Sequence, residues 1–240
     1  MKTIKTVHGV RYYNYDTRKY PFHEIMAKLF DVKSLDLVHD ILDGTHESGL
    51  FTNESDDKTK LHHMFYTKLN SGWPAFEKLY KDFISENIRN IFSIEEVIYQ
   101  TKPTFRAQLP NNIAVGGNEN DSQERYGWHK DTDDNYNHPN FEKNFIIPLT
   151  NSKDTASVYI ETAPGSDAFW PAEMKVGEFF QFNGGECVHG NKKNITGKSR
   201  ISLDFRIVLP TDYNEAYIKS SKLSKKKFII GHYYSKIGKV

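Results

Sequence analysis

Two histidines and an aspartate are spaced as the ligands of a metal ion would be. His129 and Asp131 are two residues apart, so on a β-strand both side chains point to the same face. His189 follows His129 by 60 residues and supplies a third ligand from another segment. Two imidazoles and a carboxylate bound to one face of an ion leave its opposite face open, an arrangement suited to Fe(II). The sequence therefore predicts a metal site at these three residues, with Asp133 and Asp134 as less favoured sources of the carboxylate.

A second polar pair follows the distal histidine. Arg200 and Ser202 lie on one face of a strand predicted over residues 200–209. The opposite face of this strand is apolar and consists of Ile201, Leu203, Phe205 and Ile207. A guanidinium and a hydroxyl on one face can hold a carboxylate at two points. Arg206 lies further along the same face and is a weaker candidate for the same task.

Together these motifs resemble the 2-oxoglutarate/Fe(II)-dependent dioxygenases, whose pattern is His-x-Asp, a distal His and then Arg, often as Arg-x-Ser. The resemblance covers roughly residues 95–210. Within that superfamily, residues 105–112 and 183–191 are similar to the streptomycin-biosynthesis dioxygenase-like branch. The resemblance implies a double-stranded β-helix, or jelly roll, with flanking helices and a mainly β fold.

The resemblance also implies the cofactors and the reaction. Fe(II) would be held by the three predicted ligands, and 2-oxoglutarate would chelate it while its far carboxylate meets Arg200 and Ser202. Molecular oxygen would be the second co-substrate, and succinate and CO2 would be released. In halogenating relatives a small residue replaces the aspartate of His-x-Asp, so the presence of Asp131 implies hydroxylation or desaturation.

Further residues are assigned to the same site as expectations. Gln108 and Asn144 are expected near the co-substrate, and Arg106 and Trp128 near the substrate. Arg106 and Gln108 share a strand face, which either lines the mouth of the barrel or faces solvent with a salt bridge. Because the loops near the site are polar, the substrate is expected to be a small polar molecule. The resemblance to the streptomycin-biosynthesis branch implies an amino sugar or a related metabolite, with an amino acid or a peptide side chain as the alternative.

Two other classes of function remain open from the sequence. A cupin-like jelly roll can hold a metal or a sugar without redox chemistry, and a relative of these enzymes can be purely structural. Arg200 with Ser202 favours the dioxygenase over the first class, and the complete set of three ligands speaks against the second.

Bulk properties exclude several partners. The chain has 240 residues and a net charge of +1, which gives no reason to expect nucleic acid as a partner. One cysteine excludes an intramolecular disulfide. The start of the chain lacks the apolar run of a signal peptide, and we find no membrane-spanning stretch, so a cytoplasmic protein is expected. The oligomeric state cannot be read from the sequence.

The pattern along the chain divides it into three regions within one domain. Residues 1–94 form a helical and extended support region, with helices predicted over 22–30, over 35–42 and from Pro74 to Ile91. Residues 95–210 form the double-stranded β-helix, and 211–240 are a basic C-terminal extension that docks on the body or on a second subunit. Loops are predicted at 43–60, at 110–128 as a mobile lid, and at 132–143. The adjacent pair His62 and His63 is interpreted as packing or surface histidines, because adjacent side chains diverge.

Overall fold

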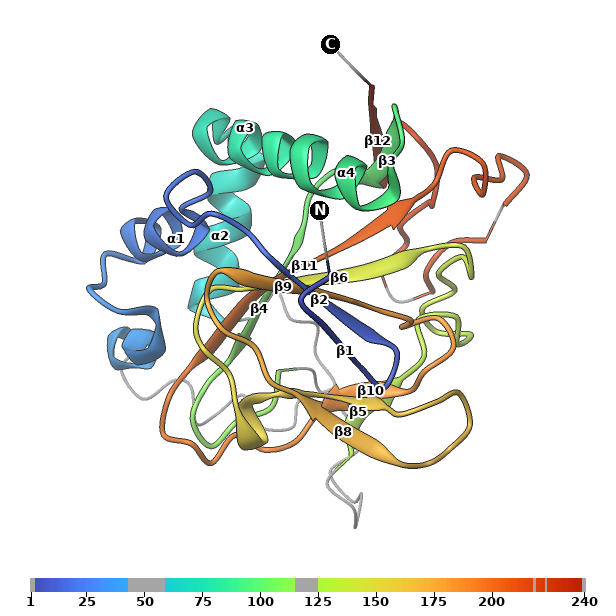
Figure 1. Ribbon diagram of the computed structural model, residues 1–240. Coiled ribbons are helices and arrows are strands. Elements are labelled where there is room, and N and C mark those ends of the chain that lie inside the picture. Colours follow the sequence, from blue (N-terminus) through green and yellow to red (C-terminus); the bar gives the residue numbers. More distant parts are fainter. Residues whose placement is uncertain (1–2, 43–58, 115–124, 218, 223, 239–240) are drawn as a thin grey trace.

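A computed structural model describes residues 3–42, 59–114, 125–217, 219–222 and 224–238. Two antiparallel sheets face each other, and helices cover the outer face of the larger sheet (Figure 1). The strands of the larger sheet are β1 (Lys5–Val7), β2 (Val10–Asn14), β3 (Val97–Gln100), β4 (Thr104–Gln108), β6 (Lys143–Pro148), β9 (Glu178–Phe182), β11 (Arg200–Val208) and β12 (Tyr234–Ile237). Those of the smaller sheet are β5 (Tyr126–His129), β7 (Val158–Glu161), β8 (Phe169–Ala172) and β10 (His189–Asn191).

The strand pairing confirms the predicted double-stranded β-helix. The eight consecutive strands β4 to β11 are divided between the two sheets, as β4–β11–β6–β9 in one and β5–β10–β7–β8 in the other. Every one of these pairs is antiparallel. Strands β1 and β2 extend the larger sheet beyond β9, and β3 and β12 extend it beyond β11. The first and last regions of the chain are therefore both attached to the sheet of the central region.

Alternation along β11 decides which side chains face the site. Ile201, Leu203, Phe205 and Ile207 are buried in the core between the larger sheet and the helices. Arg200 and Arg206 project from the other face and line a cavity between the two sheets. The predicted division of this strand into an apolar and a polar face is thus confirmed, and it carries the two arginines to the interior of the jelly roll.

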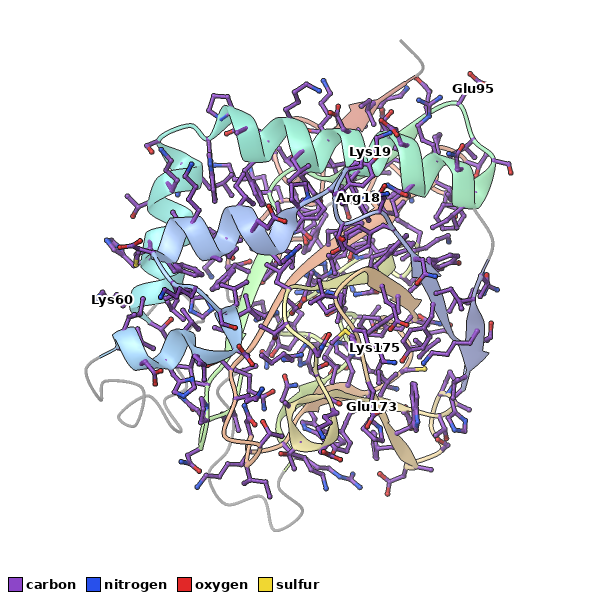
Figure 2. All side chains as sticks on the ribbon, turned by 60° about the vertical axis from the view of Figure 1, so that its left-hand side comes forward. Arg18, Lys19, Lys60, Glu95, Glu173 and Lys175 are labelled. Carbon is purple, nitrogen blue, oxygen red and sulfur yellow. The ribbon has the colours of Figure 1, made fainter. Side chains whose placement is uncertain are left out.

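The helical elements are α1 (Phe22–Phe30), η1 (Leu35–Ile41), α2 (Lys60–Asn70), α3 (Pro74–Phe83), η3 (Ile84–Ile88), α4 (Arg89–Phe92) and η4 (Asp154–Ala156). The prediction for α1 is confirmed. The element predicted over 35–42 is a 3-10 helix, and Ser34 before it makes no side-chain capping bond. Charged side chains such as Lys60 and Glu95 lie on the outside of this layer (Figure 2).

The apolar stripe that begins at Pro74 packs on the sheet as expected. It continues through α3, a π-helical turn at η3 and α4. Phe83 is fully buried, and its ring meets the edges of Phe179 from β9 and Phe205 from β11. Aromatic pairs of this kind contribute beyond simple area burial. The helices therefore cover the face of the larger sheet that is turned away from the site.

Two of the predicted loops lie partly outside the described residues, and two other segments can be compared with the sequence predictions. Residues 43–58 of one predicted loop and 115–124 of the predicted lid lie outside the described residues. Residue Lys60 begins α2, a helix that was not predicted, whose first turn is capped by the Thr59 side chain. At the other end, Phe228 and Tyr234 are fully buried, so the C-terminal extension docks on the body of this chain. None of the helices in the described ranges combines the length and the apolar character needed to span a bilayer.

Candidate metal centre

The two predicted histidine ligands are cross-strand partners. His129 ends β5, His189 begins β10, and the two residues face each other in the antiparallel register. Asp131 lies two residues beyond β5, where its backbone N–H donates to the carbonyl of Gly184 at 2.8 Å. The pairing of β5 with β10 therefore brings together ligands that lie 60 residues apart in the chain.

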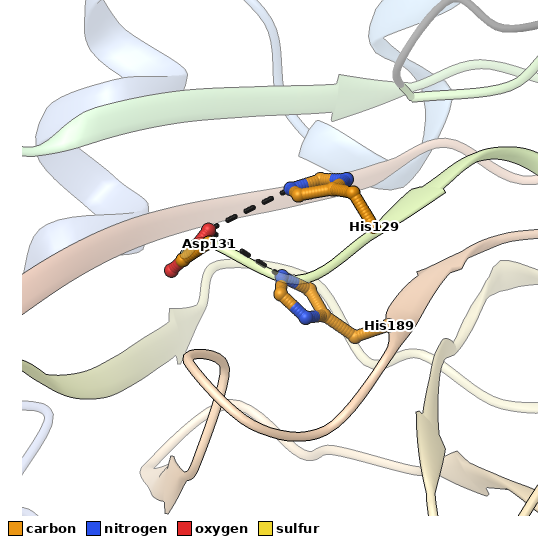
Figure 3. A group of neighbouring side chains, drawn as sticks. All are labelled: His129, Asp131 and His189. Carbon is orange, nitrogen blue, oxygen red and sulfur yellow. Dashed lines mark ion pairs between the residues drawn. The ribbon is translucent and has the colours of Figure 1, made fainter. Parts of the chain in front are cut away.

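The three side chains converge on one point (Figure 3). Asp131 Oδ1 lies 3.6 Å from His129 Nε2 and 3.8 Å from His189 Nε2. Among the residues described, this is the one group of three with ligand atoms all within 4.8 Å of one another. Ligands about 2.1 Å from an ion and at right angles are about 3 Å apart, so the Asp131 oxygen needs to approach each of the two nitrogens by less than about 1 Å. Asp133, by contrast, accepts a hydrogen bond from the backbone of Lys130 and does not join the group.

Backbone carbonyls set the orientation of both imidazoles. His129 Nδ1 lies 2.7 Å from the carbonyl of Gly127, and His189 Nδ1 lies 3.1 Å from that of Cys187. A carbonyl only accepts, so each Nδ1 carries the proton and each Nε2 presents its lone pair to the centre. The ring of Tyr136 stacks on His129 with 4.0 Å between ring centroids, which fixes that imidazole from one side.

Burial and neighbouring charges favour the metal-binding protonation states of His189 and Asp131. Burial, and next the proximity of His129, lower the pKa of His189 to about 4, so its imidazole is neutral at pH 7. Burial by itself raises the pKa of Asp131, but the Arg206 guanidinium and the nearby imidazoles outweigh it and hold that pKa well below its usual range. At neutral pH, His189 therefore offers a neutral nitrogen and Asp131 offers a carboxylate.

The two oxygens of Asp131 have different surroundings. Oδ2 accepts from Arg206 Nη2 at 2.8 Å, from Arg206 Nε at 3.2 Å and from Asn144 Nδ2. Oδ1 is buried and has no hydrogen-bond partner among the described residues. A buried carboxylate oxygen without a donor is costly unless a cation meets it. The orphaned oxygen faces both Nε2 atoms, so the three residues fit a divalent ion such as Fe(II).

Arg200 is a buried cation without an ion pair in the described structure. Its side chain is 2 % exposed, its Nε has no hydrogen-bond partner, and Nη2 donates to Asn191 Oδ1 at a long 3.4 Å. Burial lowers the pKa of this guanidinium to about 10, so it is still charged at neutral pH. Asn191 belongs to β10 with His189, which brings the Arg200 guanidinium to the metal side of the cavity.

The other residues assigned to the co-substrate are also buried, but they have protein partners. Ser202 Oγ donates to Asp204 at 3.1 Å, and Gln108 Nε2 donates to the carbonyl of Lys192 at 2.6 Å. Gln108 Oε1 is buried without a partner among the described residues. Asn144 holds Asp131, and its Oδ1 accepts from the backbone N–H of Gly184 at 3.2 Å. The direct role of these three residues in co-substrate binding stays a prediction.

The two residues assigned to the substrate have different positions. Arg106 lines the cavity and donates from Nε to Asp204 at 3.0 Å, so its face of β4 points inward and also carries a salt bridge. Trp128 is not among the residues that line the cavity. Its ring stacks on Tyr159, and its Nε1–H donates to the carbonyl of Asn191 at 2.9 Å. A role of Trp128 toward substrate stays a prediction, and its observed contacts include residues of β7, β8 and β10.

Sequence reasoning missed the residues that hold the ligands in place. Glu142 lies 3.3 Å from Arg206 Nε, and the Tyr233 hydroxyl accepts from Arg206 Nη1 at 3.4 Å. His138 Nδ1 lies 2.8 Å from Glu142 Oε2, and the His138 ring packs on Phe228 of the C-terminal extension. Alternation was one available signal, because Glu142 stands two residues before Asn144 and so shares its face.

The sequence of the chain is similar to that of a streptomycin biosynthesis protein. No protein-family model matches the chain. The chain is 28% identical to the streptomycin biosynthesis protein StrG from Streptomyces griseus over an alignment of 213 residues. The alignment covers 86% of this chain and 94% of that protein. The resemblance to the streptomycin-biosynthesis branch is confirmed. It extends well beyond residues 95–210, the part of the chain on which the motifs placed it.

Solved structures resemble the chain more distantly. A non-heme monooxygenase, ThoJ in complex with nickel, shares 9% identity at a TM-score of 0.41, over 85% of this chain and 75% of the other. A prolyl-4-hydroxylase from Pseudomonas putida shares 13% identity at a TM-score of 0.40, over 84% and 88%. These likenesses are remote, and the assignment of the jelly roll rests on the strand pairing described above.

Proposed function

We propose that the chain is a non-haem Fe(II) and 2-oxoglutarate-dependent dioxygenase that hydroxylates or desaturates a small polar metabolite. The observation that carries the proposal is Arg200, a buried guanidinium without a carboxylate partner in the described structure, beside a His-Asp-His centre. A buried cation of this kind costs stability unless an anion meets it. The far carboxylate of 2-oxoglutarate is such an anion, and it would arrive with a keto acid able to chelate the metal.

The residues of the chain have separate tasks in this reaction. His129, Asp131 and His189 hold the iron, and Arg200 orients the co-substrate by its far end. When bound, Fe(II) and 2-oxoglutarate supply oxygen activation coupled to decarboxylation of the co-substrate. Apolar walls such as Phe182 exclude water from the oxidising centre. In hydroxylation one oxygen atom enters succinate and the other enters the product, with CO2 released, whereas in desaturation the second oxygen leaves as water.

The cavity between the sheets is narrow. Its volume of about 40 Å³ is room for a few waters, and it is lined by all three ligands, Arg106 and Arg200. A five-carbon dicarboxylate is larger than this space, so lining side chains must move apart when it binds. The hydrogen bond from Arg200 Nη2 to Asn191 is long, at 3.4 Å, and we expect it to be exchanged for a contact with the co-substrate.

The substrate class follows from the relative and from the loops. StrG is a streptomycin biosynthesis protein by name, which supports a small polar metabolite such as an amino sugar. An amino acid remains the second class of candidate, because the residues around the cavity include both cationic and carboxylate side chains.

Two measurements test the proposed function. Fe(II) with 2-oxoglutarate under anaerobic conditions should raise the melting temperature above that with Fe(II) alone, because a ligand that binds only the folded state stabilises it. Succinate release should then be stimulated by the correct member of a panel of amino sugars and amino acids. A cupin-like protein without redox chemistry would show metal binding, with neither the second thermal shift nor succinate.

A further inference from the structure

A chain of buried polar contacts leads from the metal ligand Asp131 to the C-terminal extension. Arg206 lies at its centre, and all three nitrogens of its guanidinium have partners. Nε and Nη2 donate to Asp131 Oδ2, Nη1 donates to the Tyr233 hydroxyl, and Nε also lies 3.3 Å from Glu142 Oε2. The side chains of Asp131 and Glu142 are each 3 % exposed.

Both carboxylate oxygens of Glu142 in turn have polar partners. Its Oε1 accepts from the hydroxyl of Tyr234, and its Oε2 lies 2.8 Å from His138 Nδ1. Tyr234 belongs to β12, which pairs with β3 at the edge of the larger sheet (Figure 1). Phe228 is fully buried in the same cluster as Tyr233 and Tyr234. The tyrosine hydroxyls are therefore fixed by a docked segment, and they fix the glutamate and the arginine.

This chain of contacts decides how Asp131 meets a metal. Three donors surround Oδ2, so turning that oxygen toward the ion would break bonds to Arg206 and Asn144. Oδ1 alone is left to face His129 and His189. The carboxylate is thereby restricted to binding through one oxygen, which leaves more of the coordination shell for co-substrate and oxygen.

We propose that Tyr233 and Tyr234 are positioning residues of the metal centre, acting through Glu142 and Arg206 to hold Asp131 as a one-oxygen ligand. The inference rests on the metal site of the proposed function and adds a part of the chain, the C-terminal extension, that the sequence motifs do not include. Loss of the Tyr234 hydroxyl leaves buried Glu142 Oε1 without its donor. Glu142 then draws Arg206 toward itself and loosens the grip on Asp131 Oδ2.

The test uses the full chain with Co(II), which reports on its ligands by its visible absorption. Tyr233→Phe, Tyr234→Phe and the double variant keep each ring and remove only the hydroxyl. Tyr217→Phe is the matched control, because Tyr217 lies against the same apolar cluster but its hydroxyl donates to the carbonyl of Asn137 at 2.8 Å. Co(II) dissociation constants and spectra are measured together with the melting temperature of each metal-free protein.

We expect the double variant to bind Co(II) about 10-fold or more weakly, as is typical when the residues that support a metal ligand are changed. Its visible spectrum should change, whereas the spectrum and affinity of Tyr217→Phe stay as in the wild type. Each single variant should show part of the effect, so the test does not depend on the double variant folding. A fall in melting temperature with unchanged affinity and spectrum would make the two tyrosines merely structural and overturn the inference. A wild-type protein that binds no divalent metal would overturn the proposed function itself.

Discussion

Arg200 and Arg206 project from the same face of β11, yet of the two only Arg206 forms an ion pair within the described structure. Both guanidinium groups are buried and both line the cavity. Arg206 is fully engaged by Asp131 and its partners, whereas Arg200 has one long contact to Asn191. The contrast separates an arginine that is paired with Asp131 from an arginine to which the proposed function assigns the co-substrate.

Replacing Arg200 by Met should separate stability from function. We expect the metal-free Arg200→Met protein to be as stable as the wild type or more stable by up to about 2 kcal/mol, because an apolar side chain removes an uncompensated buried charge. The same change should weaken 2-oxoglutarate binding by at least about 30-fold, since a charge-assisted contact in a desolvated site is lost. Urea denaturation and anaerobic titration measure the two effects.

The matched variant is Arg206→Met, which should destabilise the protein by about 3–5 kcal/mol because Asp131 and Glu142 lose their buried partner. If Arg206→Met weakened co-substrate binding and Arg200→Met did not, the assignment of the two arginines would be reversed.

The metal ligands give a second prediction. His189→Ala and His129→Ala should each bind little iron and show no turnover, because each removes one of three donors. His63→Ala is a suitable control, since His63 is exposed on α2 and lies outside the group. Iron content is measured after anaerobic loading and desalting. Full iron content in His189→Ala would contradict the site.

Much of the fold could be predicted because it depends on local periodicity, and the ligands could be predicted from the order and spacing of the His-x-Asp motif and the distal histidine. Alternation identified the faces of β11, and the His-x-Asp spacing placed His129 and Asp131 together. Strand β8 was not predicted, because Pro171 within it interrupts the strand pattern and fits the edge position that β8 occupies in its sheet. Strand β10 is three residues long, too short for alternation to show.

Apart from the approach of His189 to His-x-Asp, the contacts between distant segments at the site could not be predicted. Alternation correctly placed Arg206 on the same face of β11 as Arg200. It does not indicate which residues of other segments each side chain contacts. Arg206 meets Asp131, which is 75 positions away, and Tyr234 meets Glu142 across 92 positions. Such pairings are set by the order of strands in the sheet, which periodicity within one segment does not contain.

A close approach beside the second histidine gives a third prediction. A Cβ atom at Gly190 would lie 2.0 Å from Cδ1 of Trp128, whose ring is held by Tyr159 and by the carbonyl of Asn191. Gly190→Ala should therefore destabilise the protein by about 2 kcal/mol or more and impair metal binding by displacing His189. Chemical denaturation and metal titration measure both effects.

The double variant Gly190→Ala with Trp128→Ala is the informative companion. Removing the indole makes room for the methyl group. The double variant should therefore lose clearly less unfolding free energy than the sum of the losses in the two single variants. Strict additivity would show that the clash is relieved in some other way.

The buried His62 predicts a dependence of stability on pH. Burial lowers its pKa from 6.5 to about 4, so between these values the unfolded chain binds a proton that the folded chain does not. The contribution of His62 to the free energy of unfolding is therefore fully present above pH 6.5 and is lost as the pH drops toward 4. This loss amounts to about 2 kcal/mol between pH 7 and pH 5. Metal-free His62→Phe should lack this part of the decline when both proteins are unfolded in urea at the two pH values. Other groups titrate equally in both proteins, and identical pH profiles would refute the assignment.

The presence of Asp131 predicts the type of product. Because this carboxylate occupies the third ligand position, no vacancy is left for chloride. With an active substrate in excess chloride, mass spectrometry should show the gain of one oxygen or the loss of two hydrogens. A chlorinated product would contradict Asp131 as a ligand and direct attention to Asp133 and Asp134.

The cross-strand pairing of His129 with His189 has a consequence for the time course of folding. The two histidines meet only after a loop of about 60 residues has closed, and such long-range pairing comes late on the way to the native state. A metal ion therefore finds no complete site in the early chain and cannot serve as a template for it. A bound metal should therefore stabilise the folded state almost entirely by slowing unfolding. The refolding rate should be the same with and without metal.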